Sequence, residues 1–161
     1  MPTADDETAP DDVSPRDLLR LRMAAHRDAN HLDGGWWPRS RDLAVELADL
    51  VDRFPDGFGR VVHAMVSPAD WDRVPHAVPA AGGLVTVGSL ERDDVHQVDL
   101  TTSDDVVLRV LVVPPGLTDY QGAEALLAAA TAGNAHSARD LLDEVTEFPA
   151  PDPMDRWTDG P

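Results

Sequence analysis

The feature of this chain that most limits its fold is a succession of strand-forming segments between residues 61 and 113. Residues 61–66 contain three β-branched valines and are apolar on both faces, which predicts a buried strand, and residues 84–90 predict another. Pro75 and Pro79 interrupt the sequence between these two segments and limit it to a short edge strand at most. The chain must therefore build a sheet.

The last two segments of the succession predict a β-hairpin. Residues 95–101 and 106–113 are strand-like and flank a short polar turn, Thr-Ser-Asp-Asp. Another strand precedes the succession, because residues 18–24 alternate between apolar and basic side chains in the manner of a half-buried strand. Residues 26–38 have no periodicity and contain two adjacent glycines, which predicts a loop.

One helix is predicted between the first strand and the rest of the sheet. Residues 41–54 place leucine, valine and phenylalanine at helical spacing, and Ser40 is a suitable N-cap. Pro55 and Gly57 then end this helix.

Two more helices are predicted after the hairpin. Thr118 and Gln121 form a capping box for the first, which runs to about residue 132, and Asn134 is placed to cap a second over 135–147. The apolar residues expected to face inward are Ala123, Leu126, Leu127 and Ala130 in the first helix, and Ala138, Leu141, Leu142 and Val145 in the second.

Consecutive strands with the helices set apart are typical of the α+β class. We therefore predict a mainly antiparallel sheet of five to six strands, with one helix after the first strand and one or two C-terminal helices. A single domain is expected over 17–147. Residues 1–16 are acidic and residues 148–161 are rich in proline, so we expect disordered termini on both sides of the domain: an acidic tail and a flexible tail.

The composition excludes several classes of chemistry. The chain has no cysteine, which excludes disulfides, thiol nucleophiles and thiolate metal sites. All of its basic residues other than histidine are arginine, so a phosphate-binding loop that needs lysine and a lysine Schiff base are excluded as well.

The formal net charge of −17 limits the partners. Nucleic acids and anionic membranes bind through cationic side chains, so neither is expected as a partner of this acidic chain. No apolar run approaches the roughly 20 residues that span a bilayer, and the first residues lack the pattern of a secretory signal. We therefore expect a cytoplasmic location.

Residues 31–42 hold the densest group of chemically useful side chains. As a binding site, Asp33, Trp36, Trp37, Arg39 and Arg41 would line a pocket, with indoles supplying apolar area and guanidinium groups holding an anion. As a structural clasp, the glycines would let the chain reverse, an indole would fill one end of the core, and an Arg–Asp pair would fix the start of the helix. The sequence leaves both interpretations open.

Histidines offer a second set of candidates. His63 lies on an apolar strand, where a hydrogen-bonded core residue is the expected role. His96 and Asp99 are three residues apart, so in a regular strand they point to opposite faces and do not bind one metal ion together. We predict no metal, no cofactor and no catalytic residue.

Three short sequence motifs of this chain also occur together in other proteins. They are DGGWWPRSRDL at 33–43, the Trp71-Asp72 pair, and VVPP at 112–115. With them, residues 18–132 resemble an actinobacterial family of small domains of unknown function that carry a DGxWWPRSxDL motif. The resemblance implies the limits of a domain and no activity, cofactor or catalytic residue.

Two functions follow as hypotheses, and they leave open whether the chain is an enzyme. The first is a non-enzymatic interaction or regulatory domain that binds an unknown protein partner or associates with itself, partly through exposed sheet edges. The alternative is a binder of a small anionic metabolite, with or without enzymatic activity, that uses Asp33, Trp36, Trp37, Arg39 and Arg41.

Overall fold

The computed structural model describes residues 19–24, 31–90, 95–131, 134 and 136–147. The predicted tails, 1–16 and 148–161, lie outside the described residues. In chain order the elements are β2 (Leu21–Met23), β3 (Gly34–Trp36), α1 (Leu43–Asp52), the 3-10 turn η3 (Asp56–Phe58), β4 (Val61–Val66), the 3-10 turn η4 (Pro68–Asp70), β5 (Ala77–Ala80), β6 (Gly83–Ser89), β7 (Gln97–Thr102), β8 (Val107–Val112), α2 (Asp119–Ala129) and α3 (Ala138–Glu147).

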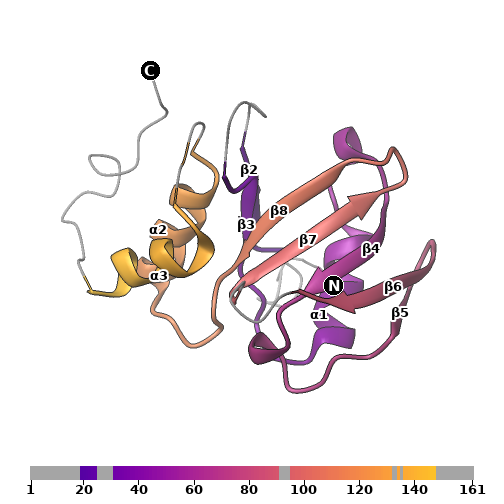
Figure 1. Cartoon of the computed structure of the whole chain (residues 1–161), viewed down its shortest axis with the longest axis horizontal. Helices are drawn as coiled ribbons and strands as arrows, with labels where there is room; N and C mark the ends of the chain where they lie inside the picture. Colours follow the sequence, from indigo (N-terminus) through magenta and orange to yellow (C-terminus); the bar gives the residue numbers. More distant parts are fainter. Residues whose placement is uncertain (1–18, 25–30, 91–94, 132–133, 135, 148–161) are drawn as a thin grey trace, which may run out of the picture.

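The strands form one seven-stranded sheet in the order β2-β3-β8-β7-β4-β6-β5 (Figure 1). The β3–β8 and β4–β6 pairs are parallel and the other neighbours are antiparallel. The predicted α+β class with a mainly antiparallel sheet is therefore confirmed. The strand count is seven rather than five to six, and the first helix follows the second of these strands rather than the first.

The predicted hairpin is confirmed. β7 and β8 pair antiparallel, with Gln97 opposite Leu111 and Thr101 opposite Val107. The polar turn between them includes Asp105 at a φ of 63°. β5 is the short edge strand that Pro75 and Pro79 allow, and it pairs with β6.

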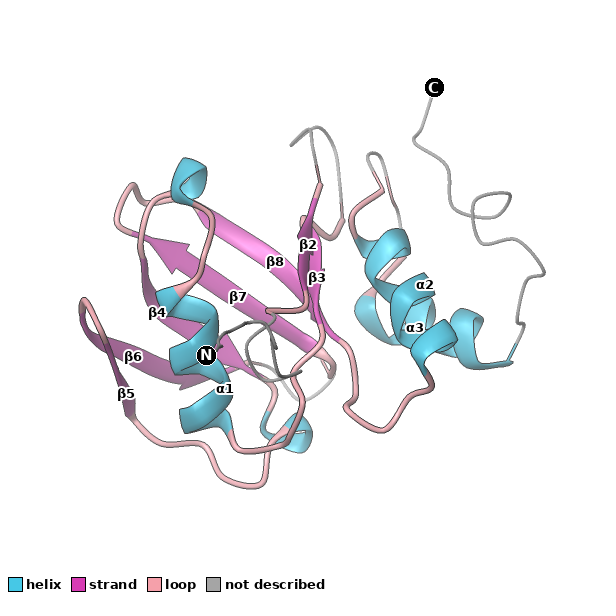
Figure 2. Cartoon of the chain, turned by 180° about the vertical axis from the view of Figure 1, so that it is seen from behind, coloured by secondary structure: helices cyan, strands magenta, loops and turns pink. Residues whose placement is uncertain are grey.

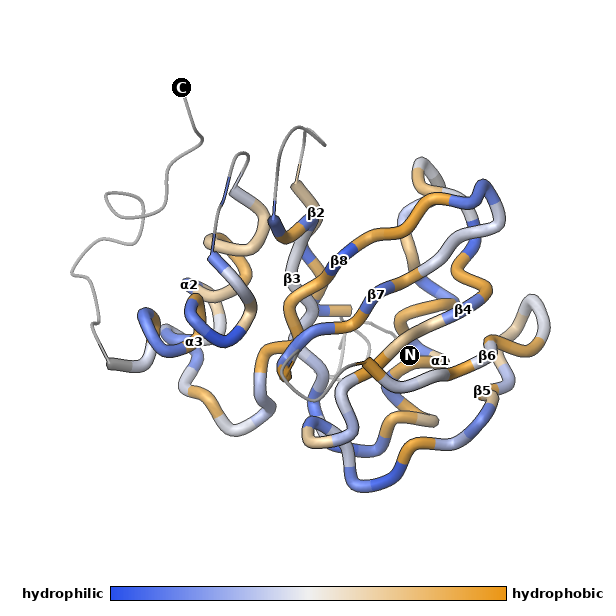
Figure 3. The backbone as a smooth tube through the Cα atoms, viewed as in Figure 1, coloured by the Kyte–Doolittle hydropathy of each residue, from blue (hydrophilic) through white to orange (hydrophobic). Residues whose placement is uncertain are grey.

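Two apolar clusters lie on opposite sides of the sheet because side chains alternate along each strand. In β8, Val110 and Val112 face the cluster that contains α1, which lies in front of the sheet in Figure 2. Leu111 and Val113 face the cluster that contains α2 and α3. Figure 3 shows β8 as a largely hydrophobic stretch that begins after the hydrophilic turn between β7 and β8.

The loop predicted over 26–38 is wrong where β3 forms. Gly34–Trp36 joins the sheet between β2 and β8, although it has no alternating pattern. A Cβ on Gly34 would come within 2.6 Å of the Arg22 carbonyl oxygen, and one on Gly35 within 3.1 Å of Leu126 in α2. The two glycines therefore let β3 lie close to its neighbours on two sides, rather than making a turn.

The helix predictions are confirmed in outline and corrected in detail. α1 begins after an N-cap at Asp42, not Ser40, and α2 has the predicted capping box of Thr118 and Gln121. The inward stripe predicted for α2 is right in part: Leu126 and Leu127 are partly buried against the α2 cluster, but Ala123 is exposed. The fully buried residues of the helix are Gly122, Glu124, Ala125, Ala128 and Ala129.

In α3 the four predicted inward residues are all buried. Asn134 does not cap α3, which begins four residues later at Ala138. Its side chain instead hydrogen-bonds backbone groups of Leu32, Ala129 and Thr131. No helix in the described part of the chain is long and apolar enough to cross a membrane.

Candidate functional site

The two adjacent indoles point to opposite sides of the sheet. Trp36 packs in the α1 cluster, with its ring centroid 5.5 Å from that of Trp71. Trp37 packs in the α2 cluster, where its indole N–H donates to the Pro114 carbonyl at 3.1 Å. The Arg20 guanidinium lies over the Trp37 ring, 3.8 Å from its centroid. The indoles therefore do not line one pocket.

Asp33 joins three segments of the sheet. Its carboxylate accepts the backbone N–H of Arg109 at 2.9 Å, and its own N–H donates to the Arg109 carbonyl at 2.7 Å. Its carbonyl accepts the N–H of Ala24 at 2.8 Å. Because Asp33 is buried, these bonds satisfy backbone groups that water does not reach.

The segment that follows holds the start of α1. The buried carboxylate of Glu46 accepts the backbone N–H of Arg39 at 3.1 Å and the Ser40 hydroxyl at 2.7 Å. Arg41 donates through Nε to Asp72 at 3.3 Å and through Nη2 to the Ala69 carbonyl at 2.8 Å. The segment before α1 therefore lies beside the Trp71-Asp72 pair.

These contacts agree with the clasp interpretation at two points: an indole in the core and an Arg–Asp pair at the helix start. The structure does not gather the five predicted residues around one pocket. Asp33, Trp36, Trp37, Arg39 and Arg41 are absent from the linings of both pockets described below. A ligand role for them stays a prediction.

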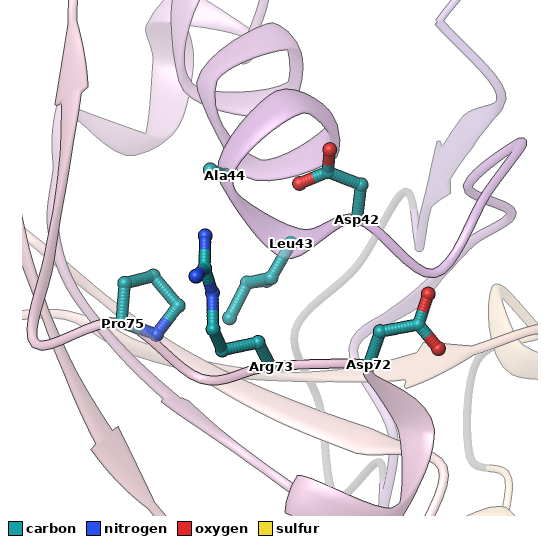
Figure 4. A pocket seen from close by; sticks show the side chains of 6 residues that line it. All are labelled: Asp42, Leu43, Ala44, Asp72, Arg73 and Pro75. Atoms are coloured by element: carbon teal, nitrogen blue, oxygen red, sulfur yellow. The ribbon is translucent and has the colours of Figure 1, made fainter.

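A pocket of about 250 Å³ opens beside the first turn of α1 (Figure 4). The Arg73 side chain extends between Pro75 and the helix, while the carboxylates of Asp42 and Asp72 lie to one side. A backbone bridge joins Asp42 to Arg73 and holds the two walls together. The remaining lining residues are Leu43 and Ala44.

A second site, which the sequence did not reveal, centres on Asp70 and His96. Asp70 Oδ1 lies 2.8 Å from His96 Nδ1, and Asp70 Oδ2 accepts the His96 backbone N–H at 2.9 Å. The carboxylate is 2% exposed, and His96 has a φ of 63°, which is uncommon for a residue other than glycine. His96 lines a groove of about 370 Å³ beside α3.

The sheet also presents an open face. On the side away from α1, α2 packs on β2, β3 and β8, and no helix in the described part of the chain packs on that side of β7, β4 and β6 (Figure 1). His63 lies there, half-buried, with Nδ1 2.5 Å from the Thr86 hydroxyl. The predicted hydrogen bond is present, but His63 is outside the core clusters.

We define the open face by the side chains that the strand register places together on that side. They are Ala77, Pro79, Leu84, Thr86, Gly88, His63, Met65, Asp99, Thr101, Val107 and Arg109. Leu84 and Val107 are 65% and 51% exposed. Nowhere in the described residues do three His, Asp or Glu side chains gather as metal ligands would.

The comparisons with known proteins give a family and no function. No curated protein and no solved structure matches the chain. A family of unknown function, DUF5994, matches residues 19–130, which run from the residues just before β2 to the end of α2 and leave out α3. The actinobacterial origin implied by the resemblance stays a prediction. Because the match covers more than half of its length, the chain belongs to the family of unknown function DUF5994.

Proposed function

We propose that this chain is an interaction domain that binds a second copy of itself through the open face of its sheet. The charge of that face carries the proposal. The whole chain has a formal charge of −17, whereas Asp99 and Arg109 are the charged residues of the open face and cancel each other. Two copies therefore meet with the least repulsion on this face.

The composition of the open face also suits association. Leu84 and Val107 are large exposed apolar residues. Met65 is half-buried and lies in β4, between the strands that carry these two residues. Interfaces between proteins are depleted of charged residues at their centres and enriched in methionine. Burial of these side chains by a second copy removes apolar surface from water, which favours binding.

The face is a better contact than the edges of the sheet. β2 has three residues, and β5 has four, one of which is Pro79. A short strand and a residue without an N–H both weaken pairing at an edge. We therefore propose that association uses the open face rather than the exposed edges of the sheet.

Symmetry gives the reason for a second copy as the partner. Asp99 and Arg109 are directly opposite each other on β7 and β8. In a two-fold dimer the same surface meets itself, so a neighbouring acid and base can each face the opposite charge on the partner.

The test compares two identical substitutions on opposite sides of the molecule. Val107 on the open face is 51% exposed and Val45 on α1 is 49% exposed. Native mass spectrometry and light scattering over a dilution series should show a dimer for the natural chain and for Val45→Asp. Val107→Asp should weaken the dimer at least about tenfold, because it buries a carboxylate in the contact.

Leu84→Glu provides a second variant in case Val107→Asp disturbs the β7–β8 hairpin. Circular dichroism should show the same folded spectrum for all variants. A natural chain that stays monomeric at every concentration overturns the proposal, and so does a dimer that Val107→Asp and Leu84→Glu leave intact. Non-covalent extra mass that Arg39→Ala abolishes in a folded protein favours the alternative, an anionic metabolite bound by Asp33, Trp36, Trp37, Arg39 and Arg41.

A further inference from the structure

The groove beside α3 has the size and lining of a small-ligand site. Its volume of about 370 Å³ lies in the range of pockets that hold small molecules. One wall comes from α3 and the other from η4, the residues before β7 and the segment after β8. The apolar part of the lining consists of Ala69, Val95, Pro114, Leu117 and Leu142.

His96 is fixed at the rim of this groove by a buried group. The Asp70 carboxylate contacts both the ring and the backbone N–H of His96. A neutral imidazole accepts a hydrogen bond at one of its ring nitrogens, and because Nδ1 faces the Asp70 carboxylate, Nε2 is the nitrogen that remains for a ligand. The positive φ of His96 costs free energy, and backbone outliers of this kind cluster at ligand sites.

Arg139 and Asp143 supply opposite charges on the other wall. They are one turn apart on α3, both are exposed, and both line the groove. Among the described residues, no ion pair joins Arg139 to Asp143 or to any other carboxylate. The groove therefore offers a cation, an anion and a hydrogen-bond acceptor around an apolar floor.

We propose that the groove binds a free α-amino acid with an apolar side chain. The carboxylate of the ligand pairs with Arg139, and its ammonium donates to Asp143 and to His96 Nε2. The apolar side chain lies against Leu117 and Leu142. Each charged residue in the lining then meets its complement, which is the arrangement that gives a polar site its specificity. This site is separate from the open face and does not depend on self-association.

The first experiment titrates the full chain with leucine by isothermal calorimetry. Leucine should bind with one site per chain. Leucine methyl ester, which lacks the carboxylate, and N-acetylleucine, which lacks the ammonium, should each bind at least about tenfold more weakly. Equal binding of either derivative overturns the assignment, and so does a failure of leucine, isoleucine, methionine and phenylalanine to bind at millimolar concentration.

Variants locate the site. Arg139→Gln and Asp143→Asn change exposed side chains of α3 and should leave the fold intact while weakening leucine at least about tenfold. Asp140→Asn is the matched control, because Asp140 is exposed on the same helix and is not part of the lining. His96→Asn keeps a residue that tolerates positive φ and should also weaken binding. Binding that Arg139→Gln and Asp143→Asn leave unchanged, or that Asp140→Asn weakens equally, places the ligand elsewhere.

Discussion

Asn134 shows how one side chain can connect distant parts of this chain. Its Oδ1 accepts the Leu32 N–H at 2.8 Å, and its Nδ2 donates to the carbonyls of Leu32 and Thr131, each at 2.8 Å. All of these groups are buried or partly buried. Asn134→Ala removes the side-chain partner of the Leu32 N–H and of these carbonyls, although the Thr131 carbonyl still accepts the backbone N–H of residue 134. It should lower the free energy of unfolding by about 2 to 4 kcal/mol, measured by urea denaturation.

Asn134→Asp separates the hydrogen bonds from the packing. Aspartate has nearly the same shape and keeps the acceptor for Leu32, but it replaces the donor with an oxygen that faces carbonyl oxygens. It should therefore destabilise the protein at least as much as alanine does. Natural stability in Asn134→Asp would show that these bonds do not contribute to folding.

At this scale the sequence shows which side chains could form hydrogen bonds and ion pairs, but not which residues they contact. The Asp70–His96 pair and the Asn134–Leu32 pair join residues that are 26 and 102 positions apart. No local pattern links such positions, because the sheet order that brings them together is set by the packing of the whole chain. The same holds at the start of α1: the residue types of the segment predict an Arg–Asp pair there, but the partner of Arg41 is Asp72, which lies 31 positions away.

At the scale of elements, the contact between α2 and Trp37, the residue after β3, depends on Gly122. A Cβ at this position would lie 2.2 to 2.4 Å from three carbons of the Trp37 ring. Glycine to alanine in a helix normally stabilises by about 0.5 to 1 kcal/mol. Here the clash with the Trp37 ring should outweigh this gain in stability. Gly122→Ala should therefore destabilise the protein by about 1 to 3 kcal/mol in thermal or urea unfolding.

Gly57→Ala is the control for this substitution. A Cβ on Gly57 would meet nothing within 4 Å, so this variant should change stability by less than about 0.5 kcal/mol. If Gly122→Ala were as stable as the natural chain, α2 would be able to move away from Trp37 without loss. The helix would then not be fixed on the sheet by this contact.

The same contact explains which elements the sequence could predict. The hairpin, the capping box and the inward side of α3 follow from local patterns, and the structure has them. The β3 strand and the buried side of α2 do not follow from local patterns, because the small residues there are needed for close contact with neighbouring elements. Gly35 lies against Leu126 and Ala129, so close packing rather than apolar periodicity decides which side of α2 is inward.

At the scale of the whole molecule, the question is whether the two clusters unfold as one unit. The family match ends before α3, yet β8 carries residues of both clusters, and the neighbouring residues Trp36 and Trp37 lie one in each. Leu47 in α1 and Leu141 in α3 are both fully buried, one in each cluster. Leu47→Ala and Leu141→Ala should each destabilise by about 2 to 5 kcal/mol and keep a single urea transition.

Hydrogen exchange of peptides from α1 and α3 makes this prediction specific. If the sheet couples the two clusters, either substitution should speed exchange in both helices by a similar factor, because both exchange through the same global unfolding. If Leu141→Ala speeds exchange in α3 and leaves α1 unchanged, the helix opens by itself. The predicted single domain over 17–147 would then be wrong, and α3 would be an addition to an independent family domain.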